Sequence, residues 1–96
     1  MTIEKIQNGN DLTMALEGRL DTTTAPQLEA EITALTGEEN LVMDFDKLEY
    51  ISSAGLRVIL AAQKKLGAGN MVIRNVCDDI KEVFDITGFS DILTVE

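Results

Sequence analysis

The chain of 96 residues is 45% hydrophobic and contains one proline, which predicts a single domain, residues 1–96, with one hydrophobic core. Its 17 acidic residues outnumber 8 basic ones, and the formal net charge of −9 argues against nucleic acids and anionic membranes as partners and favours solubility or a basic protein surface. With no histidine and one cysteine, Cys77, the sequence excludes a Ser-His-Asp triad, a phosphohistidine carrier, an internal disulfide and an ordinary zinc site.

The first two elements are expected to form a β-hairpin. Asn8-Gly9 is a two-residue turn signal between candidate strands over residues 2–7 and 11–17. In the second strand, apolar side chains recur at every other position and so point to one face: Leu12, Met14 and Leu16.

The first helix is expected to begin at Thr24. Thr24 can serve as its N-cap, Pro26 is tolerated in the first turn, and Gln27 completes a capping box. Gly37 is placed to end this helix. Its apolar face follows at spacings of four and three residues: Leu28, Ile32 and Leu35.

The rest of the chain continues to alternate between strand and helix periods. The expected elements are a strand over residues 41–45, a helix over 53–66, a strand over 71–73, a helix after Asp78-Asp79 and a strand over 92–95. Gly67 or Gly69 is expected to end the first of these helices, and Gly88 the second. The second presents three apolar residues inward: Ile80, Val83 and Phe84.

This order, β-β-α-β-α-β-α-β, predicts an α/β domain. Strand–helix–strand units form right-handed crossovers between parallel strands, and the opening hairpin adds an antiparallel edge. We therefore expect a mixed, mostly parallel sheet with the helices packed largely on one face.

The segment of most functional interest joins a strand to the helix over 53–66. Two of the three serines in the chain, Ser52 and Ser53, stand here. One interpretation is that they only cap the helix. The other is functional, because strand-to-helix turns lie at the carboxyl ends of the strands, where open α/β sheets place their sites. Asp21 would lie on the same edge as Ser53, and Asp44 is a weaker candidate for that edge.

The same helix is expected to carry a small apolar strip on its outer side, formed by Ala54, Val58 and Ala61. Arg57 and Lys65 flank this strip. Such a strip suits docking by a partner protein, and it equally suits packing against a neighbouring helix of the same domain. The sequence leaves both interpretations open.

Catalysis, metal binding and cofactor binding are not predicted. Ser53 has no histidine base and no Gly-x-Ser-x-Gly surroundings. No calcium-loop spacing occurs among the acidic residues. A receiver domain needs a lysine after its last strand, and an acyl carrier protein is a helical bundle with an Asp-Ser-Leu motif, so neither class fits.

Residues 50–56 (Tyr-Ile-Ser-Ser-Ala-Gly-Leu) resemble the phosphorylation motif of the STAS domain family, the anti-sigma factor antagonists. The usual motif has apolar residues followed by Asp, Ser, Ser or Ala, Gly and Leu. Residues 18–21 with Thr24-Ala25 are similar to the family's motif after the second strand, and residues 84–89 to the end of its third helix. The resemblance spans nearly the whole chain in matching order and implies a STAS-like fold.

The resemblance also implies roles for particular residues. The family's phosphoacceptor falls on Ser53, and its preceding Asp falls on Ser52, a departure that makes Ser52 a second candidate acceptor. Asp21 matches a residue close to the phosphorylated serine, and Asp44 is a weaker candidate for that edge. The expected partner-binding residues are Asp21, Ser52, Ser53, Ala54, Arg57, Val58 and Ala61.

The implied function is partner switching without enzymatic activity. The unphosphorylated antagonist binds an anti-sigma factor, itself a serine/threonine kinase, and so frees a sigma factor; phosphorylation separates the complex, and a serine phosphatase resets it. The alternative is a constitutive STAS-like scaffold or subunit of a signalling or transport complex without phosphorylation.

The expected location is the cytoplasm, without membrane insertion. No apolar stretch approaches the roughly 20 residues of a membrane-spanning helix, and residues 1–6 lack the apolar region of a signal peptide. Cys77 is expected to be partly buried at a helix start.

Overall fold

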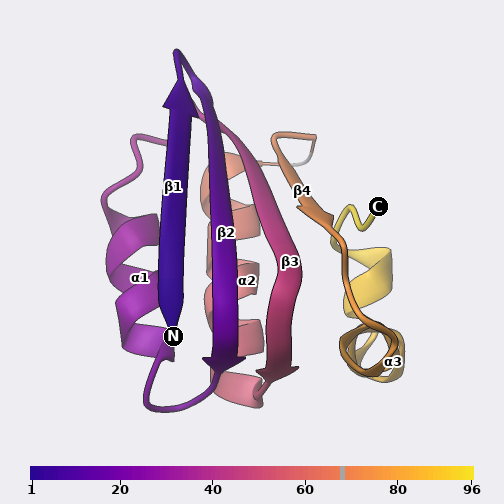
Figure 1. The fold of residues 1–96 in the computed structure, drawn as a ribbon. Coiled ribbons are helices and arrows are strands. Elements are labelled where there is room, and N and C mark those ends of the chain that lie inside the picture. The colour runs from indigo at the N-terminus through magenta and orange to yellow at the C-terminus, as the bar shows by residue number, and fades with distance from the viewer. Residues whose placement is uncertain (68) are drawn as a thin grey trace.

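The computed structural model describes residues 1–67 and 69–96, and its elements follow the predicted order as far as the third helix (Figure 1). They are β1 (Thr2–Asn8), β2 (Asp11–Leu20), α1 (Ala25–Thr33), β3 (Asn40–Ile51), α2 (Ser53–Leu66), β4 (Met71–Arg74), α3 (Asp78–Thr87) and the short 3₁₀ helix η1 (Phe89–Asp91).

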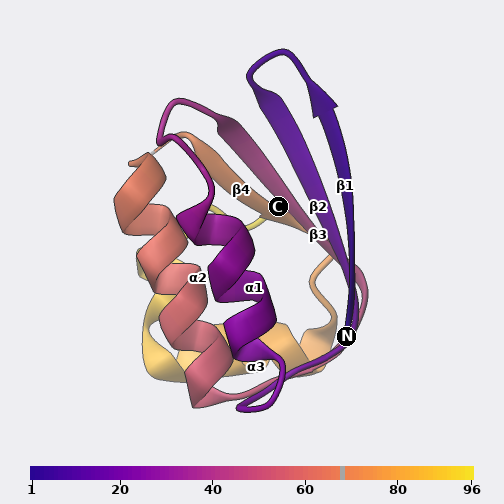
Figure 2. The ribbon, with the colours of Figure 1, turned by 90° about the vertical axis from the view of Figure 1, so that its left-hand side faces the viewer.

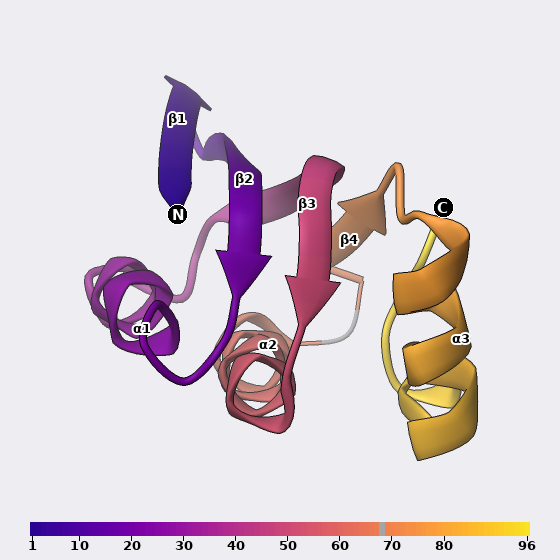
Figure 3. The same cartoon turned by 60° about the horizontal axis from the view of Figure 1, so that its bottom comes forward.

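The sheet has the strand order β1-β2-β3-β4. The β1–β2 pair is antiparallel, whereas β2–β3 and β3–β4 are parallel and are connected through α1 and α2. Figures 2 and 3 show α1 and α2 side by side beneath one face of the sheet and α3 beyond β4, while the opposite face has no helix over it. The predicted mixed sheet with helices on one face is therefore confirmed.

The hairpin turn lies one residue later than predicted. Asn8 pairs with Asp11, so the loop consists of Gly9 and Asn10. Gly9 has a φ of 63°, which costs glycine little and other residues more. The loop thus places its glycine first, where the positive φ is needed.

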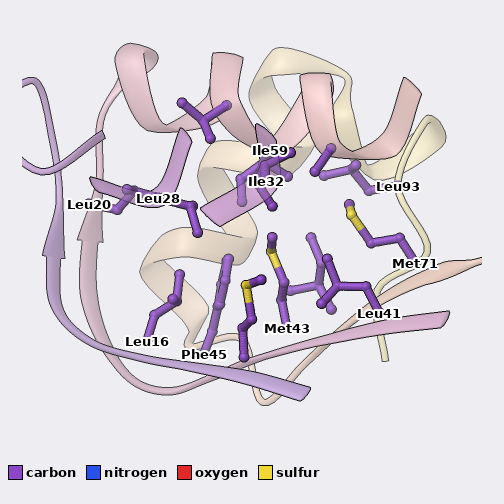
Figure 4. Close-up of a cluster of buried hydrophobic side chains, with 14 of the residues drawn as sticks. Leu16, Leu20, Leu28, Ile32, Leu41, Met43, Phe45, Ile59, Met71 and Leu93 are labelled. Carbon is purple, nitrogen blue, oxygen red and sulfur yellow. The ribbon is translucent and has the colours of Figure 1, made fainter. Parts of the chain in front are cut away.

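The hydrophobic core lies between the helices and the covered face of the sheet (Figure 4). The predicted alternation in β2 is confirmed, since Leu12, Met14 and Leu16 are all buried. The rings of Phe45 and Phe84 pack at 6.4 Å between centroids and join β3 to α3. Other fully buried side chains include Leu20, Leu28, Met43, Ile59, Met71, Ile73 and Ile80.

β3 is much longer than the predicted strand over residues 41–45. Its pairing with β2 shifts register twice, opposite Ala15/Glu17 and Gly18/Arg19, as β-bulges do. After Phe45 the buried residues therefore recur at a spacing of three, at Leu48 and Ile51, instead of two. A strand predicted from the alternation of buried and exposed residues therefore stops too early, at Phe45.

α1 begins where predicted but without the predicted capping box. The Thr24 hydroxyl donates to the Arg19 carbonyl at 2.7 Å and makes no bond to the helix N-terminus, and the Gln27 amide donates to the Met1 carbonyl at 3.1 Å. The helix also ends at Thr33, before the predicted stop at Gly37.

The other two helices agree closely with the sequence. α2 spans the predicted residues and is followed by Gly67 as its C-cap, and α3 ends at Gly88 in the left-handed conformation. Cys77 is the N-cap residue of α3 and is exposed, which corrects the expectation of partial burial.

The expected last strand is reduced to a single bridge. Val95 pairs in parallel with Ile73, whose N–H donates to the Thr94 carbonyl at 2.9 Å. The 3₁₀ helix η1 precedes this bridge in the chain. Within the described residues, no helix is long and apolar enough to cross a membrane.

Candidate functional site

The strands β2 and β3 end side by side and bring two loops to one edge of the sheet. Leu20 and Ile51 are the last paired residues, and the Ser52 N–H donates to the Leu20 carbonyl at 2.9 Å. We call this edge the rim and define it as residues 21–24 and 52–54. Figure 3 shows both strands pointing toward the rim, with α1 and α2 beginning from it. Asp21 and Ser53 therefore share an edge, as the topology predicts.

The two serines on the rim differ in what their hydroxyls contact. Ser52 is the N-cap of α2, and its Oγ accepts the Gly55 N–H at 3.5 Å. Ser53 is the first residue of the helix and is exposed. Within residues 1–67 and 69–96, its hydroxyl forms no hydrogen bond with another side chain or the backbone. Ser52 thus has a structural role, and the Ser53 hydroxyl is free for chemistry with a partner.

Gly55 allows α2 to lie directly against the ends of the two strands. A Cβ at this position would stand 2.7 Å from Leu20 Cγ, 2.9 Å from Ile51 Cγ1 and 3.0 Å from the Leu20 carbonyl oxygen. Any larger residue would push the first turn of the helix off the sheet. Backbone packing therefore sets the position of Ser53.

The Asp21 carboxylate organises the other loop of the rim. Its Oδ1 accepts the Thr23 hydroxyl at 2.7 Å, the Thr23 N–H at 3.0 Å and the Thr24 N–H at 3.2 Å. The hydrogen bond from the Thr23 hydroxyl, supported by the backbone N–H groups, lowers the pKa of Asp21 below its usual value. The rim therefore carries a fixed negative charge at neutral pH.

Arg19 and Tyr50 border the rim on the uncovered face of the sheet. They are cross-strand partners, and the Arg19 guanidinium lies 4.2 Å from the centroid of the Tyr50 ring. Arg19 Nε is also 3.6 Å from Asp21 Oδ2. The sequence analysis did not assign these residues a role, although both stand inside the motifs that it compared with the STAS family.

A groove of about 510 Å³ runs between α1 and α2 and begins next to Ser53. Four predicted partner-binding residues line it: Ala54, Arg57, Val58 and Ala61. Val58 is only 5% exposed, so part of the predicted outward strip packs against α1, the alternative that the sequence left open. The other three remain accessible to different degrees.

α1 supplies the opposite wall of this groove, which the sequence analysis did not anticipate. Pro26, Glu29 and Thr33 line it from exposed positions on α1, and Thr22 extends it to the rim. Pro26, Glu29 and Thr33 recur at spacings of three and four and so share one face of α1, which is the sequence signal that could have found them.

Asp44 does not lie on the rim, which corrects the expectation that it borders Ser53. Asp44 and Asp46 are inside β3, and Asp44 precedes Ile51 by seven positions, roughly 20 Å along the strand. Asp44 Oδ1 accepts the Asn75 side-chain amide and the Asp46 N–H, each at 3.0 Å. Its contacts stabilise the strand and a neighbouring loop.

Potential metal ligands do not gather at the rim. Across the described parts of the chain, no group of three His, Cys, Asp or Glu side chains is arranged to hold a metal ion. The chemistry available at the rim is that of exposed hydroxyls, those of Ser53, Thr22 and Thr23, on the same edge as the Asp21 carboxylate.

The comparisons with known proteins agree on one family. Residues 2–96 match the model of the STAS domain. The chain is 40% identical over 99 residues to BtrV of Bordetella bronchiseptica, a candidate anti-sigma factor antagonist, covering 99% of this chain and 84% of BtrV. It is 28% identical over 98 residues to the anti-sigma-B factor antagonist of Bacillus subtilis, covering 99% and 90% of the two chains.

Solved structures show the same fold. The chain matches SpoIIAA, a Bacillus cell fate determinant and anti-sigma factor antagonist, in two forms at 19% identity. The TM-score is 0.75 for the unphosphorylated form, covering 99% of this chain and 87% of that one, and 0.74 for the phosphorylated form, covering 99% and 91%. The fold is thus similar to both forms to nearly the same extent.

Proposed function

The chain belongs to the STAS domain family, and on this basis we propose that it is an anti-sigma factor antagonist switched off by phosphorylation of Ser53. The observation that carries the proposal is the exposed, unbonded hydroxyl of Ser53 at the start of α2. The relatives described as anti-sigma factor antagonists support it. The protein acts as a binding module, and the catalytic groups belong to its partners.

The partner of the unphosphorylated protein is an anti-sigma factor that is also a serine/threonine kinase. Binding takes this partner away from a sigma factor, and transfer of a phosphoryl group to Ser53 ends the binding. A serine phosphatase restores the active form. Since the kinase uses ATP and the sigma factor serves RNA polymerase, the switch operates in the cytoplasm.

Electrostatics at the rim explain how one phosphate can act as a switch. A phosphoserine carries about −1.5 to −2 charges at pH 7, and it would share the rim with the Asp21 carboxylate, whose lowered pKa keeps it ionised. The N-terminus of α2 tolerates this charge, because no acidic residue occupies its first turn. A partner surface fitted to a small hydroxyl would meet a hydrated dianion. A loss of about 3 kcal/mol weakens binding more than a hundredfold.

The proposed docking surface combines the rim with the groove between α1 and α2. Asp21, Ser52 and Ser53 form the rim part, and Ala54, Arg57, Val58 and Ala61 the groove part. Val58 contributes an apolar floor, while its accessible neighbours contribute the wall. Contact with the groove would position the kinase over Ser53, since the groove begins beside it.

A constitutive scaffold without phosphorylation is the second candidate. The observation in its favour is Ser52, which stands where the family usually has Asp. This argument for a scaffold is weak, because Ser52 caps α2 and Asp is an equally good N-cap. The departure removes a charge while the local architecture is kept.

The decisive experiment is phosphorylation of the intact protein. The chain is incubated with ATP and each kinase-like anti-sigma factor of its own genome, and the intact mass is measured. We expect the addition of one phosphate, lost in Ser53→Ala and retained in Ser52→Ala. If no candidate kinase adds phosphate, the scaffold replaces the switch; if Ser52→Ala alone loses it, the acceptor is Ser52.

A binding measurement tests the consequence of phosphorylation. Ser53→Asp places a carboxylate on the first turn of α2, so we expect it to bind the cognate kinase at least tenfold more weakly than the native protein. Circular dichroism and thermal unfolding verify that the variant is folded. A folded Ser53→Asp protein with native affinity contradicts the proposal.

A further inference from the structure

Within the described residues, Arg57 differs from the other arginines in having no carboxylate partner. Arg19 pairs with Asp21, and Arg74 pairs with Glu96 at 2.9 Å. Arg57 is exposed on α2, and among the described residues no acidic side chain lies within 4.0 Å of its guanidinium. An unpaired arginine is notable in a chain with 17 acidic residues.

Arg57 is also one helical turn beyond Ser53. α2 is continuous from Ser53 to Leu66, so residues 53 and 57 have the i, i+4 relation in which Cβ atoms are about 5–6 Å apart. Both side chains are exposed. An acidic group that precedes a basic one by four residues is the more favourable orientation of such a pair.

The charged groups around this pair leave Arg57 as the cation for a phosphate on Ser53. Lys65, further along the groove, donates to the carbonyls of Ile32 and Thr33 at 3.2 and 2.9 Å, at the end of α1. Arg19 is held by Asp21 and Tyr50. Glu29 lines the opposite wall of the groove and repels a phosphate, as Asp21 does.

We propose that Arg57 forms an intrahelical ion pair with the phosphate of phosphorylated Ser53. This inference rests on the proposed phosphorylation of Ser53 and adds a residue that responds to it. In the unmodified protein the guanidinium stands over the wall of the groove; after phosphorylation it turns back toward the N-terminus of α2. Phosphorylation therefore changes both parts of the docking surface, because it adds charge at the rim and withdraws a cation from the groove.

The pair has a signature in the titration of the phosphate. Phosphoserine is installed at position 53 during synthesis of the full chain, and its second pKa, near 6 in the absence of a partner, is followed by ³¹P NMR. A nearby guanidinium favours the dianion, so we expect this pKa to rise by about 0.15–0.4 pH units in Arg57→Gln. The N-terminus of α2 is the same in both proteins, so the difference isolates Arg57.

Arg74→Gln is the matched control. It removes the same charge from a residue that is paired in register with Asp44, roughly 20 Å along the sheet from the rim. We expect it to leave the phosphate pKa unchanged. The Nε–H resonance of Arg57 in the protein with native Arg57 should shift with pH in step with the phosphate.

The inference is overturned if the phosphate pKa is equal in the native-Arg57 and Arg57→Gln proteins. It is also overturned if the chemical shift of the Arg57 Nε–H does not change as the phosphate titrates. Neither readout needs a kinase, because the phosphoserine is installed during synthesis. Failure of every kinase to modify Ser53 would remove the proposed function and leave this measurement intact. The two hypotheses therefore fail separately.

Discussion

Neighbouring hydroxyls at the rim have different surroundings, and this difference makes them separable by mutation. Ser52 Oγ accepts a backbone N–H of α2, whereas the Ser53 hydroxyl extends into solvent. The bond of Ser52 forms only in the folded state, so its loss should lower the free energy of unfolding. The Ser53 hydroxyl makes no such bond, and its loss should leave the free energy of unfolding nearly unchanged.

Ser52→Ala is expected to lower the free energy of unfolding by about 0.5–1 kcal/mol, since a helix N-cap is lost and its bond of 3.5 Å is long. Ser53→Ala, the matched control, should change it by less than about 0.5 kcal/mol. Urea denaturation measures both values. A larger loss for Ser53→Ala would mean that its hydroxyl has a structural contact.

Gly55→Ala should be the most destabilising single-atom addition on α2. The new Cβ would stand within 3.0 Å of Leu20 and Ile51, and overpacking of this kind costs about 1–3 kcal/mol. Urea denaturation again provides the measurement. Ala61→Ser adds one atom at an exposed position of the same helix and should cost less than about 0.5 kcal/mol. Equal effects of the two substitutions would contradict the close packing.

At the level of elements, helices were easier to predict than strands. α2 and α3 end at glycines and present regular apolar faces, so their bounds follow from the sequence. β3 has bulges, which change its burial period from two to three, and bulges depend on pairing with β2 and leave no local signal. The rim could be predicted because it needs only strand order. The groove could not, since it depends on how α1 lies beside α2.

The loop between α1 and β3 shows why α1 ends early. Glu39 is 8% exposed, and its carboxylate accepts the Thr36 N–H, the Thr36 hydroxyl and the Gly37 N–H, each at 3.0 Å. The backbone hydrogen bond from Thr36 is the largest cause that lowers the pKa of Glu39 below its ordinary value of 4.5. An acid two to three residues further along the chain thus holds the residues that the sequence assigned to the helix end.

Glu39 should therefore contribute a pH-dependent part of the stability. Because its pKa is lower in the folded state, this contribution is present above about pH 4.5 and is lost as the pH falls through the folded-state pKa. Glu39→Gln should lower the melting temperature most near neutral pH, and the difference from the native protein should shrink in acid. Glu38→Gln, an exposed neighbour, should give no such trend. A difference that is constant from pH 3 to 7 would contradict this role.

For the whole molecule, the arrangement predicts a switch without a change of fold. The rim lies at one end of the domain, whereas the hairpin turn lies at the other (Figure 1).

Phosphoserine at position 53 should therefore perturb amide resonances only near the modification. We expect shifts in the rim, in the first two turns of α2 and along the groove wall of α1, measured in ¹H–¹⁵N spectra of the modified and unmodified chains. Resonances of β1 and β4 serve as the internal control and should not move. Shifts spread across those strands would indicate a global rearrangement.

The close seating of Gly55 on the strand ends has a consequence for recognition. Ser53 is held on a stiff helical turn, whereas most kinase substrates present their serine on a flexible segment that adapts to the enzyme. A kinase that fits this rim would recognise a surface that forms only when the chain folds. An excised peptide of residues 48–58 should then be a poor substrate. Only antagonist molecules that have folded correctly would be phosphorylated.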